Sequence, residues 1–214
     1  DLILASCPDL TFLSIGQCFS LTSEKVAAGF AERRMKKKKE LILTHLDLSG
    51  LPVPEESLTL ICKVCPKLTH LALSGVTTLS ETAMLALAQL SELRNLKLDN
   101  ATANDTCIQK LVRGPSPAAK SLRSITLAPP QKSTIQITDR ALIDIAANCN
   151  KLNHIHLTIC PITIEGIRAV VAECGELQDL LIMQCDTVDQ VAFKQLSAQN
   201  KGTITMWGRF TVSN

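Results

Sequence analysis

Nine cysteines and four histidines are the side chains of this 214-residue chain that are best suited to bind a metal or form a cross-link. Six of the cysteines form three pairs in which the two members lie eleven residues apart. Such a pair is compatible with a disulfide, with half of a metal site or with a structural role. Cys62 and Cys65 form a further pair with the Cys-x-x-Cys spacing of metal and redox half-sites. The six equally spaced cysteines are Cys7, Cys18, Cys149, Cys160, Cys174 and Cys185.

The equally spaced cysteines flank copies of an LxxLxL pattern, and this repeat indicates which elements hold them in place. Seven copies begin 25 to 33 residues apart, a period typical of a solenoid. Their first residues are Leu10, Leu43, Leu68, Leu93, Leu122, Leu152 and Leu177. The alternation of the last positions predicts a short strand in each copy, and Ile204 and Met206 continue the register in a final, degenerate strand.

Segments with helical spacing follow several of the predicted strands, and the clearest span residues 80–90, 138–149 and 164–174. A strand followed by a helix, stacked in register, predicts an α/β solenoid of about seven repeats, with parallel strands on its concave face and helices on its convex face. The Pro-, Gly- and Ser-rich stretches 113–121 and 127–134 predict loops. The residues expected to cap helix starts are Thr22, Ser80, Thr138 and Thr163.

The pattern C-x2-L-x2-L-x-L-x2-C, followed by a helix start of the Ile/Val-Thr-Asp kind, resembles the cysteine-containing leucine-rich repeat. This repeat occurs in F-box proteins, in the related mitotic-exit-network antagonist proteins and in some axonemal scaffold proteins. The resemblance covers nearly the whole chain and is strongest in the repeats that begin at Cys7, Cys149 and Cys174. It is partial at Cys65, where Val76 takes the second cysteine position. In the other three repeats the first cysteine position is taken by Glu40, Leu90 and Ala119.

The repeat register favours a structural role for the paired cysteines. Two cysteines of one repeat lie at opposite ends of a strand, farther apart than the roughly 4.4–6.8 Å between Cα atoms that a disulfide spans. Equivalent cysteines of neighbouring repeats, such as Cys149 and Cys174, are able to approach each other but stay reduced inside a cell. Because a thiol is small and apolar, we expect these cysteines to fill buried packing positions. No second ligand pair accompanies Cys62 and Cys65, so we expect no metal and no cofactor.

The strand alternation also predicts which side chains point to the concave face. All four histidines do so, and His45 and His70 fall in the same column of adjacent repeats, with Asp47 beside them. This is either an ordinary exposed polar pair or a metal-binding or pH-sensing one. The last repeats present apolar residues there, and Trp207 either anchors a partner or caps the solenoid. The predicted partner-binding residues are Phe12, His45, Asp47, His70, Asn95, Lys97, His154, His156, Asp179, Leu181, Met183 and Trp207.

A single segment holds much of the positive charge. The chain has a net charge of +2, and the run RRMKKKK at 33–39 alone carries six cations. We expect it at a helix end or loop on the rim, where it contacts an acidic partner or nucleic acid, acts as a localisation signal or is simply solvated. The low aromatic content of 3% disfavours binding of single-stranded nucleic acid. The cations are Arg33, Arg34, Lys36, Lys37, Lys38 and Lys39.

No nucleophile–base pair, glycine-rich phosphate loop or carboxylate pair stands out, so we expect a protein-interaction module and not an enzyme. The resemblance implies an intracellular substrate-recognition domain of an F-box-type ubiquitin ligase. The alternative is a structural scaffold subunit of a large assembly such as an axonemal complex. No apolar run is long enough to predict a membrane span. Because the sequence begins inside a repeat, we expect residues 1–214 to form one leucine-rich-repeat domain, the C-terminal part of a longer chain.

Overall fold

The computed structural model describes residues 6–7, 9–18, 20–35, 41–76, 79–130, 137–199 and 203–207. Its strands are β1 (Phe12–Ser14), β2 (His45–Asp47), β3 (His70–Ala72), β4 (Asn95–Asp99), β5 (Ser124–Ala128), β6 (His154–Thr158), β7 (Asp179–Met183) and β8 (Thr203–Trp207). Its helices are α2 (Ser23–Met35), α3 (Glu55–Val64), α4 (Glu81–Leu87), α5 (Asp105–Val112), α6 (Pro117–Ser121), α7 (Asp139–Asn148), α8 (Ile164–Glu173) and α9 (Gln190–Gln199).

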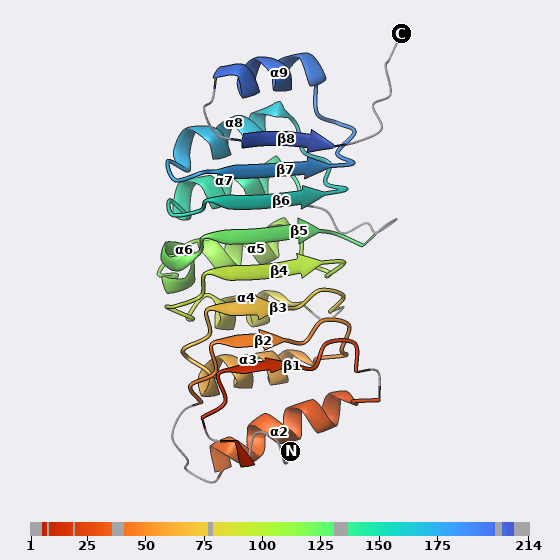
Figure 1. The fold of residues 1–214 in the computed structure, drawn as a ribbon, viewed down its shortest axis with the longest axis vertical. Helices are drawn as coiled ribbons and strands as arrows, with labels where there is room; N and C mark the ends of the chain where they lie inside the picture. The colour runs from red at the N-terminus through yellow and green to blue at the C-terminus, as the bar shows by residue number, and fades with distance from the viewer. Residues whose placement is uncertain are drawn as a thin grey trace.

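The eight strands of the described residues form one parallel sheet in which each strand pairs with the next along the chain. The register keeps equivalent apolar positions opposite one another, as in the row Leu46, Leu71 and Leu96. Figure 1 shows the strands stacked in sequence order along the long axis, with α3, α4, α5, α7 and α8 behind them. The predicted α/β class, the parallel strands and the helices on the opposite face are therefore confirmed.

One apolar core lies between the sheet and its helices, because every second strand residue points toward the helices. In β4, Leu96 and Leu98 are buried, whereas Asn95, Lys97 and Asp99 are at least partly exposed on the other side. This alternation is what a sheet with one covered face requires. We call the face that the described helices leave uncovered the open face (Figure 1).

The predicted capping residues start their helices. Thr22 Oγ1 accepts a hydrogen bond from a backbone N–H in α2, and Ser80 Oγ does the same in α4. Thr138 and Thr163 accept from the N–H groups two residues ahead, at 3.3 and 3.2 Å. These bonds satisfy donors that the first helical turn leaves without an internal partner. All four predicted caps are therefore confirmed.

Two of these caps are also tied to a helix of the preceding repeat. The backbone N–H and the hydroxyl of Thr138 donate to the carboxylate of Asp105 at 2.7 and 2.5 Å. One repeat later, Thr163 donates in the same way to Asp139 at 2.7 and 2.6 Å. Each carboxylate lies in the first turn of its own helix, where the helix dipole favours negative charge. The start of α5 therefore holds the start of α7, and the start of α7 holds that of α8.

One predicted loop is wrong in part. Residues 117–121 form the short helix α6, because Pro117 takes the first helical turn and Ser116 Oγ accepts from the Ala119 N–H at 3.1 Å. Proline and serine are typical of loops, but the same two types also start helices. In the second stretch, β5 ends at Ala128, residues 129–130 have no regular structure, and residues 131–136 lie outside the described part of the chain.

All nine cysteines are free thiols, and seven of them are buried. Burial raises the pKa of Cys62, Cys65 and Cys149 to about 12, so these thiols stay protonated and unreactive at neutral pH. The expectation of burial is wrong for Cys7 and Cys18, which are exposed. They flank β1, the edge strand of the sheet, and no described repeat packs beyond it.

Equivalent cysteines of neighbouring repeats approach each other, as the register predicts. The backbone N–H of Cys160 donates to Cys185 Sγ at 3.3 Å, and the Cys174 thiol donates to the carbonyl of Cys149 at 3.9 Å. The interaction with Cys160 lowers the pKa of Cys185 against the effect of burial, and the interaction with Cys185 together with burial raises the pKa of Cys160. This pair differs chemically from the other buried thiols.

The basic run begins at a helix end, as predicted, since Arg33 and Arg34 lie near the end of α2. Its lysines Lys36, Lys37, Lys38 and Lys39 lie outside the described residues. The contact role of this run stays a prediction.

Candidate functional site

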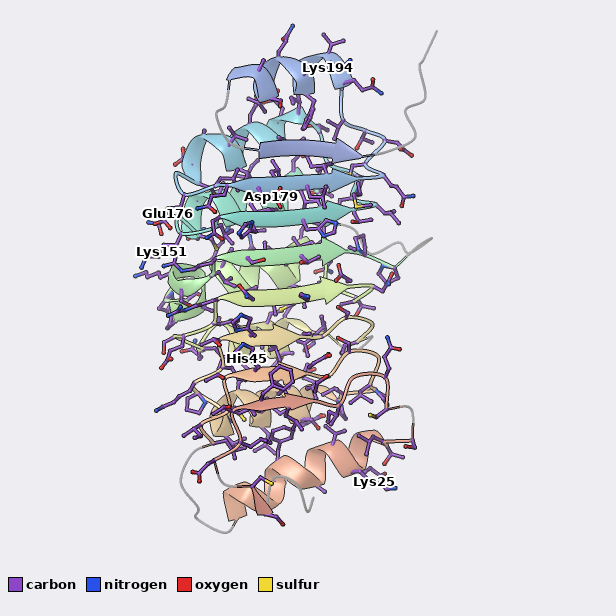
Figure 2. The ribbon with its side chains drawn as sticks, viewed as in Figure 1. Lys25, His45, Lys151, Glu176, Asp179 and Lys194 are labelled. Carbon is purple, nitrogen blue, oxygen red and sulfur yellow. The ribbon has the colours of Figure 1, made fainter. Side chains whose placement is uncertain are left out.

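The partner-binding residues predicted from the sequence fall into two groups on the open face. One group comes from β1 to β4 and the other from β6 and β7. Figure 2 labels a member of each, His45 in the lower half of the view and Asp179 in the upper half. Trp207 ends β8 opposite Met183, and its side chain is outside the described part of the structure.

Three rings stack across β1, β2 and β3, and we call Phe12, His45 and His70 the ring stack. Parallel pairing places the three residues opposite one another. The ring centroids of Phe12 and His45 lie 5.7 Å apart, and those of His45 and His70 lie 4.0 Å apart with only 12° between the planes. Phe12 is 61% exposed, which is unusual for so large an apolar side chain. The predicted column is therefore confirmed, and it is a direct contact.

Threonines before the two histidines fix the orientation of both imidazoles. The hydroxyl of Thr44 donates to the Thr11 carbonyl at 3.0 Å, and the hydroxyl of Thr69 donates to the Thr44 carbonyl at 3.0 Å. We assign the single hydrogen of each hydroxyl to the carbonyl, so that the hydroxyl oxygen accepts from the histidine Nδ1, at 2.9 Å for His45 and 2.8 Å for His70. Nδ1 therefore carries a hydrogen, and in the neutral rings Nε2 holds the free lone pair.

Partial burial and cationic neighbours favour the neutral form of His70. Partial burial lowers the pKa of His70, and the charges of His45, Arg94 and Lys97 lower it further. At neutral pH this imidazole is therefore a hydrogen-bond acceptor through Nε2.

Asp47, beside the ring stack, is engaged within the protein. Its carboxylate accepts from the Ser49 N–H at 2.9 Å and from the Ser14 hydroxyl at 3.1 Å. Partial burial alone would raise the pKa of Asp47, but these hydrogen bonds and the charge of Lys97 together lower it. Asp47 thus links the ends of β1 and β2, and its charge is largely satisfied before any partner arrives.

A hollow of about 290 Å³ lies on the open face beside the ring stack. Its position follows from side-chain length, because Ala72 stands between Asp47 and Lys97 in one row of the sheet. A single methyl group there leaves room that the longer neighbours border. The hollow brings together six of the predicted residues, and its full lining is Phe12, His45, Leu46, Asp47, His70, Leu71, Ala72, Asn95, Lys97 and Ser124.

The second group makes contacts among its own members. His156 Nε2 lies 3.3 Å from the sulfur of Met183 and 3.2 Å from the Thr158 hydroxyl. His154 Nδ1 lies 3.9 Å from the Asp179 carboxylate, and both side chains are about half exposed. Leu181 stands opposite His156 and is only partly exposed. These residues lie where predicted, but the hollow does not include them.

Sequence reasoning missed Thr44, Thr69 and Arg94, and although strand alternation places Ala72 on this face, Ala72 was not among the predicted partner-binding residues. One signal was present, because Thr-His-Leu occurs at 44–46 and again 25 residues later at 69–71. No comparable pattern singles out the alanine or the arginine.

No protein-family model matches this chain, and a search of curated proteins finds no significant relative. Among the described residues, no helix combines the length and apolar character needed to cross a membrane. The interpretation of the open face therefore depends on its own geometry and chemistry.

Proposed function

We propose that this chain is a leucine-rich-repeat solenoid that binds a partner protein through its open face and catalyses no reaction. The single observation that carries the proposal is the hollow beside the exposed ring stack. An exposed aromatic side chain at the edge of a concave site is a frequent anchor in protein interfaces. The repeat type is supported by the in-register rows of leucines and by the cysteine spacing of the sequence.

We further propose that the partner is a substrate presented to an F-box-type ubiquitin ligase, as the sequence resemblance implies. Nine free cysteines support an intracellular site of action, because reducing compartments keep thiols unpaired. In this proposal the solenoid contributes selectivity and another part of the assembly carries out the transfer of ubiquitin.

A photo-crosslinking experiment in cells tests the proposal. A benzoylphenylalanine replaces Phe12 in one version of the protein and Leu85 in the control, which is 48% exposed on α4 at the helical side. We expect irradiation to attach one defined protein at position 12 and none at position 85. Recovery of the cullin adaptor with the same complex supports the ligase, whereas constant stoichiometry with a fixed assembly supports the scaffold alternative. Identical products from both positions contradict binding through the open face.

A further inference from the structure

We propose that the hollow takes an acidic segment of the partner protein, whose carboxylate lies between Lys97 and the Nε2 edges of the two histidines while an adjacent apolar side chain packs on Phe12. This inference rests on the proposed function and adds the chemistry of the partner. It follows from three independent features of the open face, namely uncompensated positive charge, oriented imidazoles and an exposed aromatic ring.

The first feature is positive charge without a partner. Among the described residues, Lys97 and Arg94 form no ion pair, although several other cations do so. Arg123 holds the equivalent position to Arg94 in the next repeat, and it forms an ion pair with Glu176 at 3.2 Å. Asp47 is the carboxylate that lines the hollow, and hydrogen bonds from Ser14 and Ser49 already occupy it. The charge of Lys97 acts on Asp47 without forming an ion pair with it, so an incoming carboxylate meets cations that are still able to pair.

The second feature is the direction of the imidazole nitrogens. Both Nδ1 atoms are held by threonine, so both Nε2 atoms are available to a ligand. Because the two planes are nearly parallel at 4.0 Å, the Nε2 lone pairs run side by side and do not converge on one point. Parallel lone pairs fit a shared metal ion poorly. Each Nε2 lone pair is instead able to take up a proton, after which the Nε2–H donates to a carboxylate.

The third feature is the ring of Phe12, which is 61% exposed and offers apolar surface next to His45.

Binding of an acidic segment at this site is coupled to protons. The charged groups around the histidine pair are Asp47 on β2, Lys97 on β4 and Arg94 just before β4, while β1 contributes the uncharged Phe12. A bound carboxylate offsets the two cations and favours protonation of His70. The complex then holds one more proton than the free protein, so the affinity rises by up to about tenfold for each unit that the pH falls. This rise ends at the lowered pKa of the free histidine.

The four histidines of the chain make a direct test feasible. Their Cε1–H resonances are assigned by one His→Gln variant each and followed by proton NMR between about pH 5.5 and 8, the range in which imidazole titrates. The probe is a capped hexapeptide of alternating Glu and Leu, and the control peptide has Gln in place of Glu. Peptide is added up to about 10 mM, which detects millimolar affinity.

We expect the acidic peptide to shift the resonances of His45 and His70, to raise their apparent pKa and to leave His154 and His156 in place. The Gln peptide should bind at least tenfold more weakly. Lys97→Gln should weaken the acidic peptide at least fivefold, whereas Lys151→Gln, at an exposed site before β6, should have no effect.

Three results would overturn the inference. They are no response at the highest concentration, equal shifts of all four histidines, or equal binding of the two peptides. A single-stranded oligonucleotide that shifts His45 and His70 more than the acidic peptide would assign the hollow to nucleic acid instead. Failure here is separable from failure of the proposed function, because cross-linking at position 12 reports any protein partner, acidic or not.

Discussion

The two ends of the open face contain the same residue types and use them differently. Toward the N-terminus, threonines hold Nδ1 of His45 and His70, and among the described residues no group bonds to their Nε2 atoms. Toward the C-terminus, His156 Nε2 already contacts Met183 and Thr158. The difference teaches that an exposed histidine indicates a site only when the local hydrogen bonds leave one of its ring nitrogens free.

The largest expected difference between the N-terminal and C-terminal parts of the molecule is in the reactivity of their buried thiols. With Cys7→Ser and Cys18→Ser removing the exposed cysteines, iodoacetamide at about pH 8 should modify Cys185 at least about 100-fold faster than Cys62. The reason is that burial raises the pKa of Cys62 to about 12, whereas the interaction with Cys160 lowers the pKa of Cys185. Peptide mass spectrometry over time measures both rates.

The thiol contrast has its own control. Cys160→Ala removes the side chain of Cys160 but keeps its backbone N–H, and it should slow the alkylation of Cys185 without changing that of Cys62. Equal rates at Cys185 and Cys62 in the parent protein would show that accessibility alone governs these thiols.

Filling the hollow should have the next largest effect. Ala72→Leu places three more carbons between Asp47 and Lys97, so affinity for the acidic hexapeptide should fall more than tenfold, or about 1.4 kcal/mol. Thr126→Leu is the matched control, because Thr126 lies in the same row of the sheet on β5 and outside the hollow lining. Fluorescence anisotropy measures binding, and thermal unfolding verifies that both variants fold. An unchanged affinity of Ala72→Leu would place the binding site elsewhere on the face.

Removal of the Thr44 hydroxyl, which orients His45, should have a smaller effect, and this effect is on stability. Thr44→Val loses the hydrogen bond to the Thr11 carbonyl and leaves Nδ1 of His45 without its acceptor, so the free energy of unfolding should fall by about 1 kcal/mol. Thr126→Val is the control, since no side-chain hydrogen bond of Thr126 is present in the described structure. Urea unfolding provides both values. A loss of equal size in both variants would mean that β propensity and not the hydroxyl network is responsible.

The smallest expected effect is a dependence of stability on pH. The pKa of His70 in the folded protein is below its usual 6.5, so as the pH falls through 6.5 the unfolded chain binds more protons than the folded one. The free energy of unfolding should therefore decline between 6.5 and the lowered pKa, and should be unaffected by this group below both values. Asp47 titrates below its usual 3.8 and lies outside this window. His70→Gln should flatten the decline, and identical slopes would contradict the assignment.

The sequence predicts the sheet well because the spacing of the leucines gives the period of the repeat. Alternation in LxxLxL is sufficient to place Leu46 and Leu71 inside and His45 and His70 outside, and parallel stacking then makes the histidines neighbours. The column was therefore predictable from residue types alone. The same logic was wrong for Cys7 and Cys18, because burial depends on whether another repeat packs against a strand, and a repeat pattern does not specify that.

The finer properties of the site depend on contacts that no spacing rule contains. The free nitrogen of each imidazole follows from the direction in which a threonine hydroxyl points. The hollow follows from the difference in length between Ala72 and its two row neighbours. The lowered pKa of His70 follows first from its partial burial and then from the nearby charges of His45, Arg94 and Lys97. Each of these properties depends on contacts between side chains in the folded protein.

The carboxylate–threonine links couple the helix starts of neighbouring repeats to one another. Each link is donated by the later helix and accepted by the earlier one, from Thr138 to Asp105 and from Thr163 to Asp139. Loss of order at the start of α7 therefore breaks both links, whereas loss of order at the start of α5 or of α8 breaks only one. Opening of α7 is therefore expected to loosen the starts of α5 and α8 as well, which amide hydrogen exchange would reveal as shared opening of the three helices.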